Sequence, residues 1–589
     1  MLFMPSKRWV VASQAPTDLL NQYEGMLPLL AQVLYSRGFK TPAAARDFLR
    51  SNDHSAGQFL SIKGKRQSID NAISRIRNAI KTKEQIIVYG DFDADGVTST
   101  ALMVQTLKAL GANVEPYIPH RVDEGYGLNS AALADLRKQG VKLVITVDCG
   151  IRSMAEVDDG RAYGLDMIIT DHHSIGSQIP SAYAVVNPKL TDCAYSEAML
   201  AGVGVAYRLA EALLTISANG KVKPTLNLDD LLELVAIGTI ADLAPMDRAE
   251  NRSLVQQGLH ALNRTKRPGL KALIETARLK HGDISARDVG FMIGPRINAA
   301  GRLDSAMIAY NLLMTGDEGE ARLLASRLEA LNVERQRMTA DAQNAIRQQL
   351  EADGGLESAL IFAGSDTFSP GIVGLVAGRL TEEFYRPAVI MEYGETESRA
   401  SCRSIPEFDI TAALDECAEL LVRHGGHAQA AGFTVVNENL PILQERLQSL
   451  AASALDGQSL MPTLKVDAEL MLNQIDLITA ADLNQLEPTG HANAAPIFVS
   501  FQAQVKEAKA FGKENAHLRL MLFRDGMAPV EAVMWRAGHL APKIENMIDI
   551  AYTLEVNEWN DRYNGGAVRT PRLNVQDFSP AGESVVIRD

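Results

Sequence analysis

Short apolar runs rich in β-branched residues alternate with helical patterns between about residues 85 and 190. The first run, Gln85–Gly90, reads as a buried strand. The residues after it place Met103, Leu107 and Leu110 on one helical face, with Thr98 as the predicted cap. Four more such runs precede residue 190, and helical patterns separate the first four of the five runs. This alternation predicts an α/β domain with a parallel, doubly wound sheet.

The pattern changes elsewhere in the chain. The stretch 317–352 reads as one helix about 50 Å long, too polar for a core and suited to connecting two domains. A second α/β region follows it, and from about Pro462 short β-like runs have the spacing of a small barrel. The predicted units are a mostly helical N-terminal segment (1–60), a first α/β domain (61–316), the connector helix (317–352), a smaller α/β domain (353–455) and a β-barrel (460–589).

Length and composition limit the class of protein. A chain of 589 residues is too long for one hydrophobic core, so several domains are expected. Hydrophobic residues make up 46% and no apolar run approaches the roughly 18 residues of a membrane span, which predicts no membrane segment. The apolar core near the N-terminus is too short for a signal peptide. Four scattered cysteines without a C-x-x-C pair predict neither a disulfide framework nor a zinc site, and a cytoplasmic location follows as the default.

The net charge of -14 argues against a protein that coats nucleic acid through bulk electrostatics, but it leaves room for a narrow site. Asp91, Asp93 and Asp95 stand at alternate positions directly after the first strand. Three carboxylates so close together repel one another, and a divalent metal is the usual neutraliser. An EF-hand loop is excluded because its twelfth position is Leu102 and a strand precedes it. The alternative is a polar turn with solvated aspartates.

Other predicted strands are also followed by aspartate and histidine residues. Asp148 follows the strand near residue 145, and Asp171, His172 and His173 follow the strand near residue 168. Carboxyl ends of parallel strands meet at one edge of a sheet, so these side chains are expected to lie near the three aspartates. Asp242 comes late in a very apolar helical segment, where a carboxylate is costly unless it is paired, metal-bound or capping the helix.

The order of these segments, DFDADG, VDCG, TDHH and TIADLAPM, resembles the DHH phosphoesterase superfamily, whose name-giving triplet is Asp171-His172-His173. The resemblance is closest to the superfamily's single-strand-specific DNA exonucleases. It extends through HRVDEGYGL (120–128), GPRINAAGRL (294–303) and GGHAQAAGFT (425–434) to a C-terminal region similar to the family's OB-fold. It implies a DHH catalytic domain, a DHHA1 domain and an OB-fold barrel.

Two departures stand out. Phe368, Ser369 and Pro370 occupy the neighbourhood in which the family usually has a Trp-His pair. The phosphate-holding G-S-G-R-S of the family becomes A-S-C-R-S here, with Ala400 and Cys402 in place of both glycines.

The resemblance assigns functional residues. Six oxygen and nitrogen ligands without a thiolate suit two Mn²⁺ or Mg²⁺ ions, which neutralise phosphate oxygens and supply hydroxide. Asp148 is expected to bridge the ions, and the Gly-Gly-His segment is expected to present N–H groups at a helix start. The implied metal ligands and catalytic residues are Asp91, Asp93, Asp95, Asp148, His172 and Asp242, and the implied phosphate contacts are Arg121, His173, Arg302, Ser401, Arg403 and His427.

The resulting hypothesis is a metal-dependent exonuclease that degrades single-stranded DNA from 5′ to 3′, releases 5′-mononucleotides and serves DNA repair and recombination. The resemblance also implies a monomer that works with a single-strand-binding protein and a helicase. One rival function is cleavage of short oligonucleotides or cyclic dinucleotides by another DHH phosphoesterase. A second rival is a non-catalytic replication scaffold. The barrel offers candidate stacking residues and lysines: Phe498, Phe501, Phe511, Trp535, Trp559, Tyr563, Lys506, Lys509 and Lys513.

Overall fold

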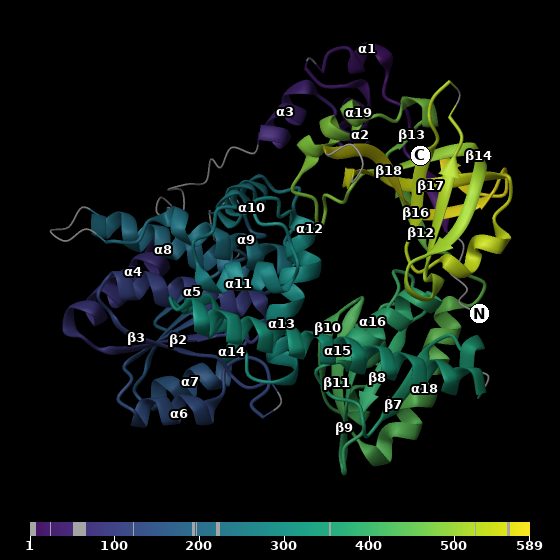
Figure 1. Cartoon of the computed structure of the whole chain (residues 1–589). Helices are drawn as coiled ribbons and strands as arrows, with labels where there is room; N and C mark the ends of the chain where they lie inside the picture. Colours follow the sequence, from purple (N-terminus) through teal and green to yellow (C-terminus); the bar gives the residue numbers. More distant parts are fainter. Residues whose placement is uncertain are drawn as a thin grey trace.

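The computed structural model describes residues 7–23, 25–50, 66–121, 123–190, 195, 197–218, 224–352, 355–524, 526–561 and 566–588, without the side chains at 66–68, 356, 559–561, 566 and 567. Figure 1 shows the first α/β domain with its helices, the long helix α15 that leads into a second α/β domain, and the C-terminal barrel. Within the described residues no helix has both the length and the apolar character needed to cross a membrane.

The first domain contains a five-stranded parallel sheet of order β3-β2-β4-β5-β6. Side chains of β2 alternate between two cores: Ile86 and Val88 pack with α4 and α5 on one face, and Ile87 and Tyr89 pack with α6 and α7 on the other. This confirms the doubly wound sheet. The elements are α4 (Arg66–Thr82), β2 (Gln85–Gly90), α5 (Ala94–Ala109), β3 (Asn113–Tyr117), α6 (Ser130–Lys138), β4 (Leu143–Val147), α7 (Met154–Ala162), β5 (Asp166–Thr170) and β6 (Ala184–Val186).

A helical layer extends the core on the α5 face of the sheet and leads into the connector. Its helices are α8 (Gly202–Ala218), α9 (Leu232–Ala241), α10 (Ala249–Leu262), α11 (Pro268–Thr276), α13 (Gly294–Leu303) and α14 (Met307–Met314). The predicted connector is one helix of 35 residues, α15 (Glu318–Ala352), which packs on α11, α13 and α14 and then on α16 of the next domain.

The second domain has a mixed sheet of order β10-β11-β9-β8-β7, in which only β7 and β8 are parallel. Its strands are β7 (Ile361–Ser365), β8 (Ala388–Glu392), β9 (Glu397–Arg403), β10 (Leu421–His427) and β11 (Ala430–Val436), and its helices are α16 (Val373–Phe384), α17 (Ile410–Asp415) and α18 (Leu440–Leu455).

The C-terminal strands close into a five-stranded barrel, because β14 pairs with both β15 and β17. The barrel strands are β14 (Ile497–Phe511), β15 (His517–Leu522), β16 (Val530–Met534), β17 (Met547–Asp561) and β18 (Gly566–Pro580), preceded by β13 (Ala468–Glu469) and α19 (Leu477–Leu483). The sequence pattern predicted four of these strands and the small barrel, and the closed barrel confirms the predicted fold class.

The N-terminal segment belongs to the barrel unit. It begins with a strand, β1 (Arg8–Val11), that lies between β12 (Thr463–Val466) and β19 (Val585–Arg588) in a parallel three-stranded sheet. After the short helix α1 (Thr17–Leu20), helices α2 (Pro28–Ser36) and α3 (Pro42–Arg50) pack into the core of the barrel. The buried side chains of this N-terminal segment therefore pack against partners more than 400 residues away in the sequence.

A buried arginine makes many of the hydrogen bonds that join the barrel unit to the first domain. Arg252 on α10 is fully buried, and its guanidinium donates hydrogen bonds to five backbone carbonyls at 2.7–3.2 Å. One carbonyl belongs to Phe48, and the other four belong to the segment 485–488 before the barrel. Met246 adds a backbone hydrogen bond of 2.7 Å to His491. These contacts fix the barrel relative to the parallel sheet of the first domain.

We expect Arg252→Ala to lower the free energy of unfolding by at least about 3 kcal/mol, because several buried carbonyl oxygens lose their donor at about 1–3 kcal/mol each. Denaturant unfolding followed by fluorescence measures the change. Arg248→Ala on the same segment is the control, since Arg248 is exposed and only approaches Asp247 at 3.6 Å. Equal stability of the two variants would contradict the role given to Arg252.

Candidate metal centre

The turn after β2 aims its aspartates toward one centre. Asp93 is the N-cap of α5, and its Oδ1 accepts the N–H groups of Asp95 at 2.9 Å and Gly96 at 3.0 Å. The prediction that Thr98 caps this helix is wrong. Thr98 lies one turn inside α5, where its hydroxyl donates to the carbonyl of Ala94 at 2.7 Å. An aspartate at the N-cap satisfies orphan N–H groups, so the helix begins at the carboxylates themselves.

Asp95 is held by a second helix. Its carboxylate accepts the N–H groups of Gly202 at 2.7 Å and Val203 at 2.8 Å, at the start of α8. A Cβ on Gly202 would stand 2.6 Å from Oδ1 of Asp148, and a Cβ on Gly238 of α9 would stand 2.9 Å from Oδ1 of Asp95. Two glycines therefore let α8 and α9 approach the buried carboxylates closely.

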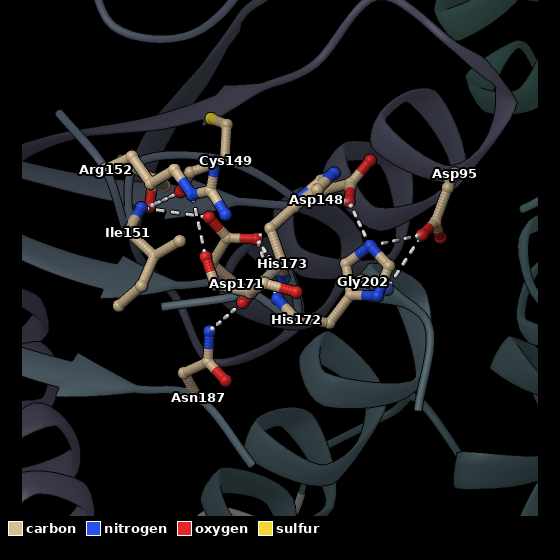
Figure 2. Close-up of polar contacts among 12 residues, drawn as sticks. Asp95, Asp148, Cys149, Ile151, Arg152, Asp171, His172, His173, Asn187 and Gly202 are labelled. Atoms are coloured by element: carbon tan, nitrogen blue, oxygen red, sulfur yellow. Dashed lines mark hydrogen bonds and ion pairs between the residues drawn. The ribbon is translucent and has the colours of Figure 1, made fainter. Parts of the chain in front are cut away.

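The ends of β4 and β5 supply Asp148 and the Asp171-His172-His173 triplet (Figure 2). Asp148 has a left-handed backbone, with φ of 61°, which is strained for a residue other than glycine and turns its side chain toward the centre. Nε2 of His172 lies 3.1 Å from Oδ1 of Asp148 and 3.9 Å from Oδ2 of Asp95. Nδ1 of the same ring lies 3.8 Å from Oδ2 of Asp242, the C-cap residue of α9.

Asp171 positions the triplet. Its Oδ1 accepts the backbone N–H groups of His172 at 2.7 Å and His173 at 3.0 Å and lies 2.7 Å from Nδ1 of the His173 ring. Its Oδ2 accepts the N–H of Ile151 at 2.9 Å. Burial would raise the pKa of Asp171, but the hydrogen bonds from His173 and Ile151 lower it. Both oxygens are occupied, so Asp171 acts as an anchor for the histidines.

All six predicted ligands meet at this edge of the sheet. Among the described residues, three groups have ligand atoms within 4.8 Å of one another. Two of these groups together hold all six predicted ligands, and the third consists of Asp148, Asp171, His172 and His173. Asp148 of one of these two groups faces His172 of the other, so the two groups adjoin. The first group is Asp91, Asp93 and Asp148, and the second is Asp95, His172 and Asp242.

Burial and mutual repulsion disfavour the charged carboxylates in this centre. The pKa of Asp95 is raised to about 7 and that of Asp242 to about 9, first by burial and then by neighbouring aspartates. The same causes raise the pKa of Asp91 and Asp148 well above the usual range. Burial and the neighbouring His173 lower the pKa of His172 to about 3, which keeps its imidazole neutral and able to bind a metal.

Several buried polar atoms of the centre have no hydrogen-bond partner, which indicates the kind of ligand that the centre can bind. Oδ1 of Asp91, Oδ1 of Asp148 and Nε2 of His172 are buried and make no hydrogen bond, because the 3.1 Å approach between the last two lacks hydrogen-bond geometry. Buried polar atoms are normally satisfied, so their convergence indicates a bound cation. Carboxylate oxygens with one imidazole nitrogen suit Mn²⁺ or Mg²⁺.

The arginines predicted to contact phosphate lie beside this centre. Arg121 lies 3.9 Å from the centroid of the Phe92 ring, and its Nε is buried without a partner. Arg302 at the end of α13 donates to the carbonyl of Gly371 in the second domain at 3.0 Å. Burial, followed by repulsion from Arg121 and other arginines, lowers the pKa of Arg302 to about 10. A bound anion such as a phosphate would relieve the repulsion among these arginines.

The altered A-S-C-R-S segment is the end of β9 and the residue after it. Ala400 and Cys402 point into the core of the second domain, whereas Ser401 and Arg403 point to the opposite face, toward α16. There Arg403 donates to the hydroxyl of Ser401 at 3.3 Å, and a Cβ on Gly374 of α16 would stand 2.9 Å from that hydroxyl. The side chains that replace the family's glycines are therefore on the core side and leave the Ser401–Arg403 face open.

His427 lies in a different local structure from the one predicted. The Gly-Gly-His segment ends strand β10 in a hairpin with β11, so it offers no helix start for an anion. The hairpin is favoured because the backbone groups of 425–427 pair with 430–432. His427 nevertheless lines a cavity of about 190 Å³ together with Asp171 and His173. The second domain thus reaches the metal centre across this cavity.

Two positioning residues were missed by the sequence reasoning. Oδ1 of Asn298 accepts the N–H of Ala94 at 2.8 Å and so completes the N-terminus of α5. The hydroxyl of Tyr126 lies 3.3 Å from Nε2 of His173. The signal was present, since Asn298 lies in GPRINAAGRL and Tyr126 in HRVDEGYGL, but those motifs were read for their arginines alone.

The barrel aromatics fall into two classes. Phe498 is fully buried beside Tyr552, and Phe501 packs against Trp9. Phe511 and Trp535 form an outer cluster with His517, with ring centroids 4.9–6.2 Å apart, and Trp535 is 42% exposed. The side chains of Trp559 and Tyr563 lie outside the described residues.

Family models match all three large units: the N-terminal domain of the DHH family over residues 85–239, the DHHA1 domain over 357–453 and the RecJ OB domain over 466–566. The fold and the site thus define a phosphoesterase of the DHH class. The curated single-stranded-DNA-specific exonuclease RecJ of Bacillus subtilis is 37% identical, matching 97% of this chain and 70% of its own length. The RecJ of Escherichia coli is 33% identical, matching 90% of this chain and 93% of its own length.

A solved structure agrees with these relatives. The crystal structure of RecJ in complex with Mn²⁺ from Thermus thermophilus has a TM-score of 0.81 and 30% identity, covering 98% of this chain and 80% of that chain. The chain belongs to the RecJ family of single-stranded-DNA-specific exonucleases.

The raised pKa values of the carboxyl groups predict that the stability of the protein without bound metal depends on pH. Asp95 and Asp242 ionise near pH 4 in the unfolded chain but only near 7 and 9 in the folded one. Between those values these two groups bind more protons in the folded state, so their contribution to stability is fully present below about pH 4 and is lost as the pH rises through 7 and 9. In EDTA we expect Tm to fall from pH 5 to 9, and Mn²⁺ to reduce that fall.

Asp242→Asn should make the fall in EDTA shallower because one destabilising ionisation is removed. Asp158→Asn on α7 is the matched control, since Asp158 is exposed and pairs only with Arg161. Thermal melts across this pH range give the slopes. Parallel slopes for Asp242→Asn and the wild type would exclude a strained carboxylate centre.

Proposed function

We propose that this protein hydrolyses the phosphodiester bonds of single-stranded DNA from a 5′ end and releases 5′-mononucleotides, with two Mn²⁺ or Mg²⁺ ions held by the six ligands above. One observation carries the proposal. Two adjoining groups of buried carboxylates, joined at Asp148 and His172, contain unsatisfied donor atoms and face a set of arginines. Bound divalent ions would neutralise phosphate oxygens and supply a nucleophile near neutral pH.

The protein's own groups prepare the substrate. Asp148 is suited to bridging because its carboxylate belongs to the first ligand group and approaches His172 of the second. Neutral His172 provides a nitrogen ligand, and Asp171 fixes its backbone. Burial would lower the pKa of His173, but the hydrogen bond with Asp171 raises it, which favours a cationic ring beside a phosphate. Arg121, Arg302 and Arg403 with Ser401 offer forked donors to phosphate oxygens.

The barrel favours a polymeric substrate. The outer cluster of Phe511, His517 and Trp535 offers rings on which bases can stack, as strand-binding barrels do. A dinucleotide phosphodiesterase has no use for such a surface, and a scaffold has no use for a complete ligand set. Both rival functions are therefore disfavoured.

Finer features stay predictions that depend on family membership. These are the 5′-to-3′ polarity, a role in DNA repair and recombination, cooperation with a single-strand-binding protein and a helicase, a monomeric state and a cytoplasmic location. Digestion of strands labelled at either end, with Mn²⁺ added, tests the polarity and the products directly.

Asp148→Asn is expected to reduce hydrolysis by far more than the roughly 10- to 100-fold that loss of an outer partner of a metal ligand costs. The reason is that the change removes a charge shared between the two ligand groups. Release of mononucleotides from a labelled strand and Mn²⁺ binding by calorimetry give the two readouts. Asp158→Asn should behave as wild type in both. Full activity of rigorously purified Asp148→Asn protein would refute the ligand assignment.

Trp535→Ala is expected to weaken single-strand binding by about 1–3 kcal/mol, the contribution of one stacked base. Tyr163→Ala serves as the control, because Tyr163 is a similarly exposed aromatic residue in the first domain, at 39% exposure. Titration of a labelled strand of mixed sequence measures both. If the two variants bind equally well, this face of the barrel does not stack bases.

A further inference from the structure

An apolar groove lies between helix α19 and the start of α2 on the barrel unit. It has a volume of about 730 Å³, and the residues that line it include Met26, Leu27, Leu477, Ile478, Ala481 and Gln485. Figure 1 shows both helices at the end of the molecule away from the second α/β domain. The groove is therefore remote from the residues that this domain offers to phosphate.

Helix α19 has apolar side chains on its solvent side as well as on its buried side. Ala480 and Leu483 are buried, and Leu483 belongs to the core of the barrel unit. Leu477, Ile478 and Ala481 are exposed at the groove, Ile478 to 69%. A surface helix normally presents polar residues to solvent, and adjoining exposed apolar side chains mark a binding surface. The solvent side of α19 is thus suited to a partner.

The chain around the groove carries negative charge only. The two segments that form it, residues 9–36 and 466–505, contain no lysine or arginine but seven aspartates and glutamates, although lysine and arginine make up 58 of the 589 residues of the chain. Arginines that reach the second segment from elsewhere are already engaged: Arg37 pairs with Asp467 at 2.9 Å, Arg588 pairs with Glu469 at 3.2 Å, and the buried Arg252 and Arg524 donate to its backbone carbonyls.

Two of these carboxylates belong to α19 itself. Asp482 lines the groove, and Asp476 is the N-cap residue of the helix. Hydrogen bonds from Thr479 lower the pKa of Asp476, so its carboxylate stays anionic. Apolar walls are therefore combined with a negative potential.

This combination selects the kind of partner. A negative potential repels nucleic acid and anionic membranes and attracts a cationic protein segment. The lining residues belong to α19, to the residues after it and to the start of α2, and none of them belongs to a strand, so an extended segment gains no strand pairing here. An amphipathic helix suits such a groove, because its apolar side contacts the walls and its basic side chains meet the carboxylates. The adaptable side chain of Met26 favours the same kind of ligand.

We propose that the groove between α19 and the start of α2 is a docking site for a basic amphipathic helix of another protein. The inference goes beyond the proposed function and does not depend on it. It gives the helices that cover the barrel a role in recruitment, separate from the Phe511, His517 and Trp535 cluster, which bases can contact.

The test uses the full-length protein with Mn²⁺ added, so that the carboxylates of the metal centre do not attract the probe. The probe is a labelled synthetic peptide about five helical turns long, with leucines on one helical face and lysines on the other. Fluorescence anisotropy should show binding that weakens as salt is added. A scrambled peptide of the same composition, and one with glutamate in place of lysine, should bind at least about 10-fold more weakly. Binding of the probe should also slow hydrogen exchange in residues 477–485.

Variants locate the binding. Ile478→Ser removes an apolar contact and Ala481→Lys adds a repelling charge, so each should weaken binding of the basic peptide at least about 10-fold. Ile442→Ser and Ala452→Lys make the same changes at exposed positions of α18 and should bind the peptide as the wild type does. Digestion of a labelled single strand should be unchanged in all four variants, which shows that they are folded.

Three results would overturn the proposal. The first is wild-type affinity for the basic peptide in both groove variants, and the second is hydrogen-exchange protection that leaves residues 477–485 unchanged. The third is self-association of the wild type in sedimentation experiments that Ile478→Ser abolishes, because a second copy of the chain would then occupy the groove.

Discussion

Repulsion between buried carboxylates is the constraint on which the rest of this structure depends. Five aspartates and a neutral histidine converge at one sheet edge, although burial and mutual repulsion raise the pKa of four of those aspartates. The surrounding elements hold them there. The start of α8 binds Asp95, a strained backbone directs Asp148, Asn298 fixes the start of α5, and Asp171 anchors the histidines. The free energy of folding therefore offsets the repulsion between these carboxylates before a metal binds.

Chemistry and recognition are divided among the units of the chain. The candidate metal ligands all come from the first domain, whereas the candidate phosphate contacts Ser401, Arg403 and His427 come from the second, and the exposed ring of Trp535 comes from the barrel. Arg302 joins the first two units by donating to Gly371, and Arg252 joins the first and third. Precise placement of a strand therefore depends on joints between domains as much as on the ligands.

Local patterns predicted much of this structure. The doubly wound sheet and the single connector helix could be read from sequence patterns. Strand periodicity also placed the aspartates after β2, Asp148 and the Asp171-His172-His173 triplet at one sheet edge, whereas the assignment of the six candidate ligands, with Asp242 at the end of helix α9, came from the family resemblance. The wrong or missed predictions concern positions where neighbouring residues compete for one structural role, or where the contacts are distant in sequence. Asp93 displaced Thr98 as the cap, and pairing with β11 made His427 part of a strand. The carbonyl partners of Arg252 lie more than 200 residues from it, and no local pattern encodes them.

The parallel sheet formed by β1, β12 and β19 has a consequence for biosynthesis. Its middle strand is the first of the described residues, and its two partners begin at Thr463 and Val585. During translation the buried Trp9 and Val11 emerge long before anything can cover them, whereas the two α/β domains between them can fold as they leave the ribosome. Completion of this three-stranded sheet therefore waits until β19 has been synthesised, more than 570 residues after β1.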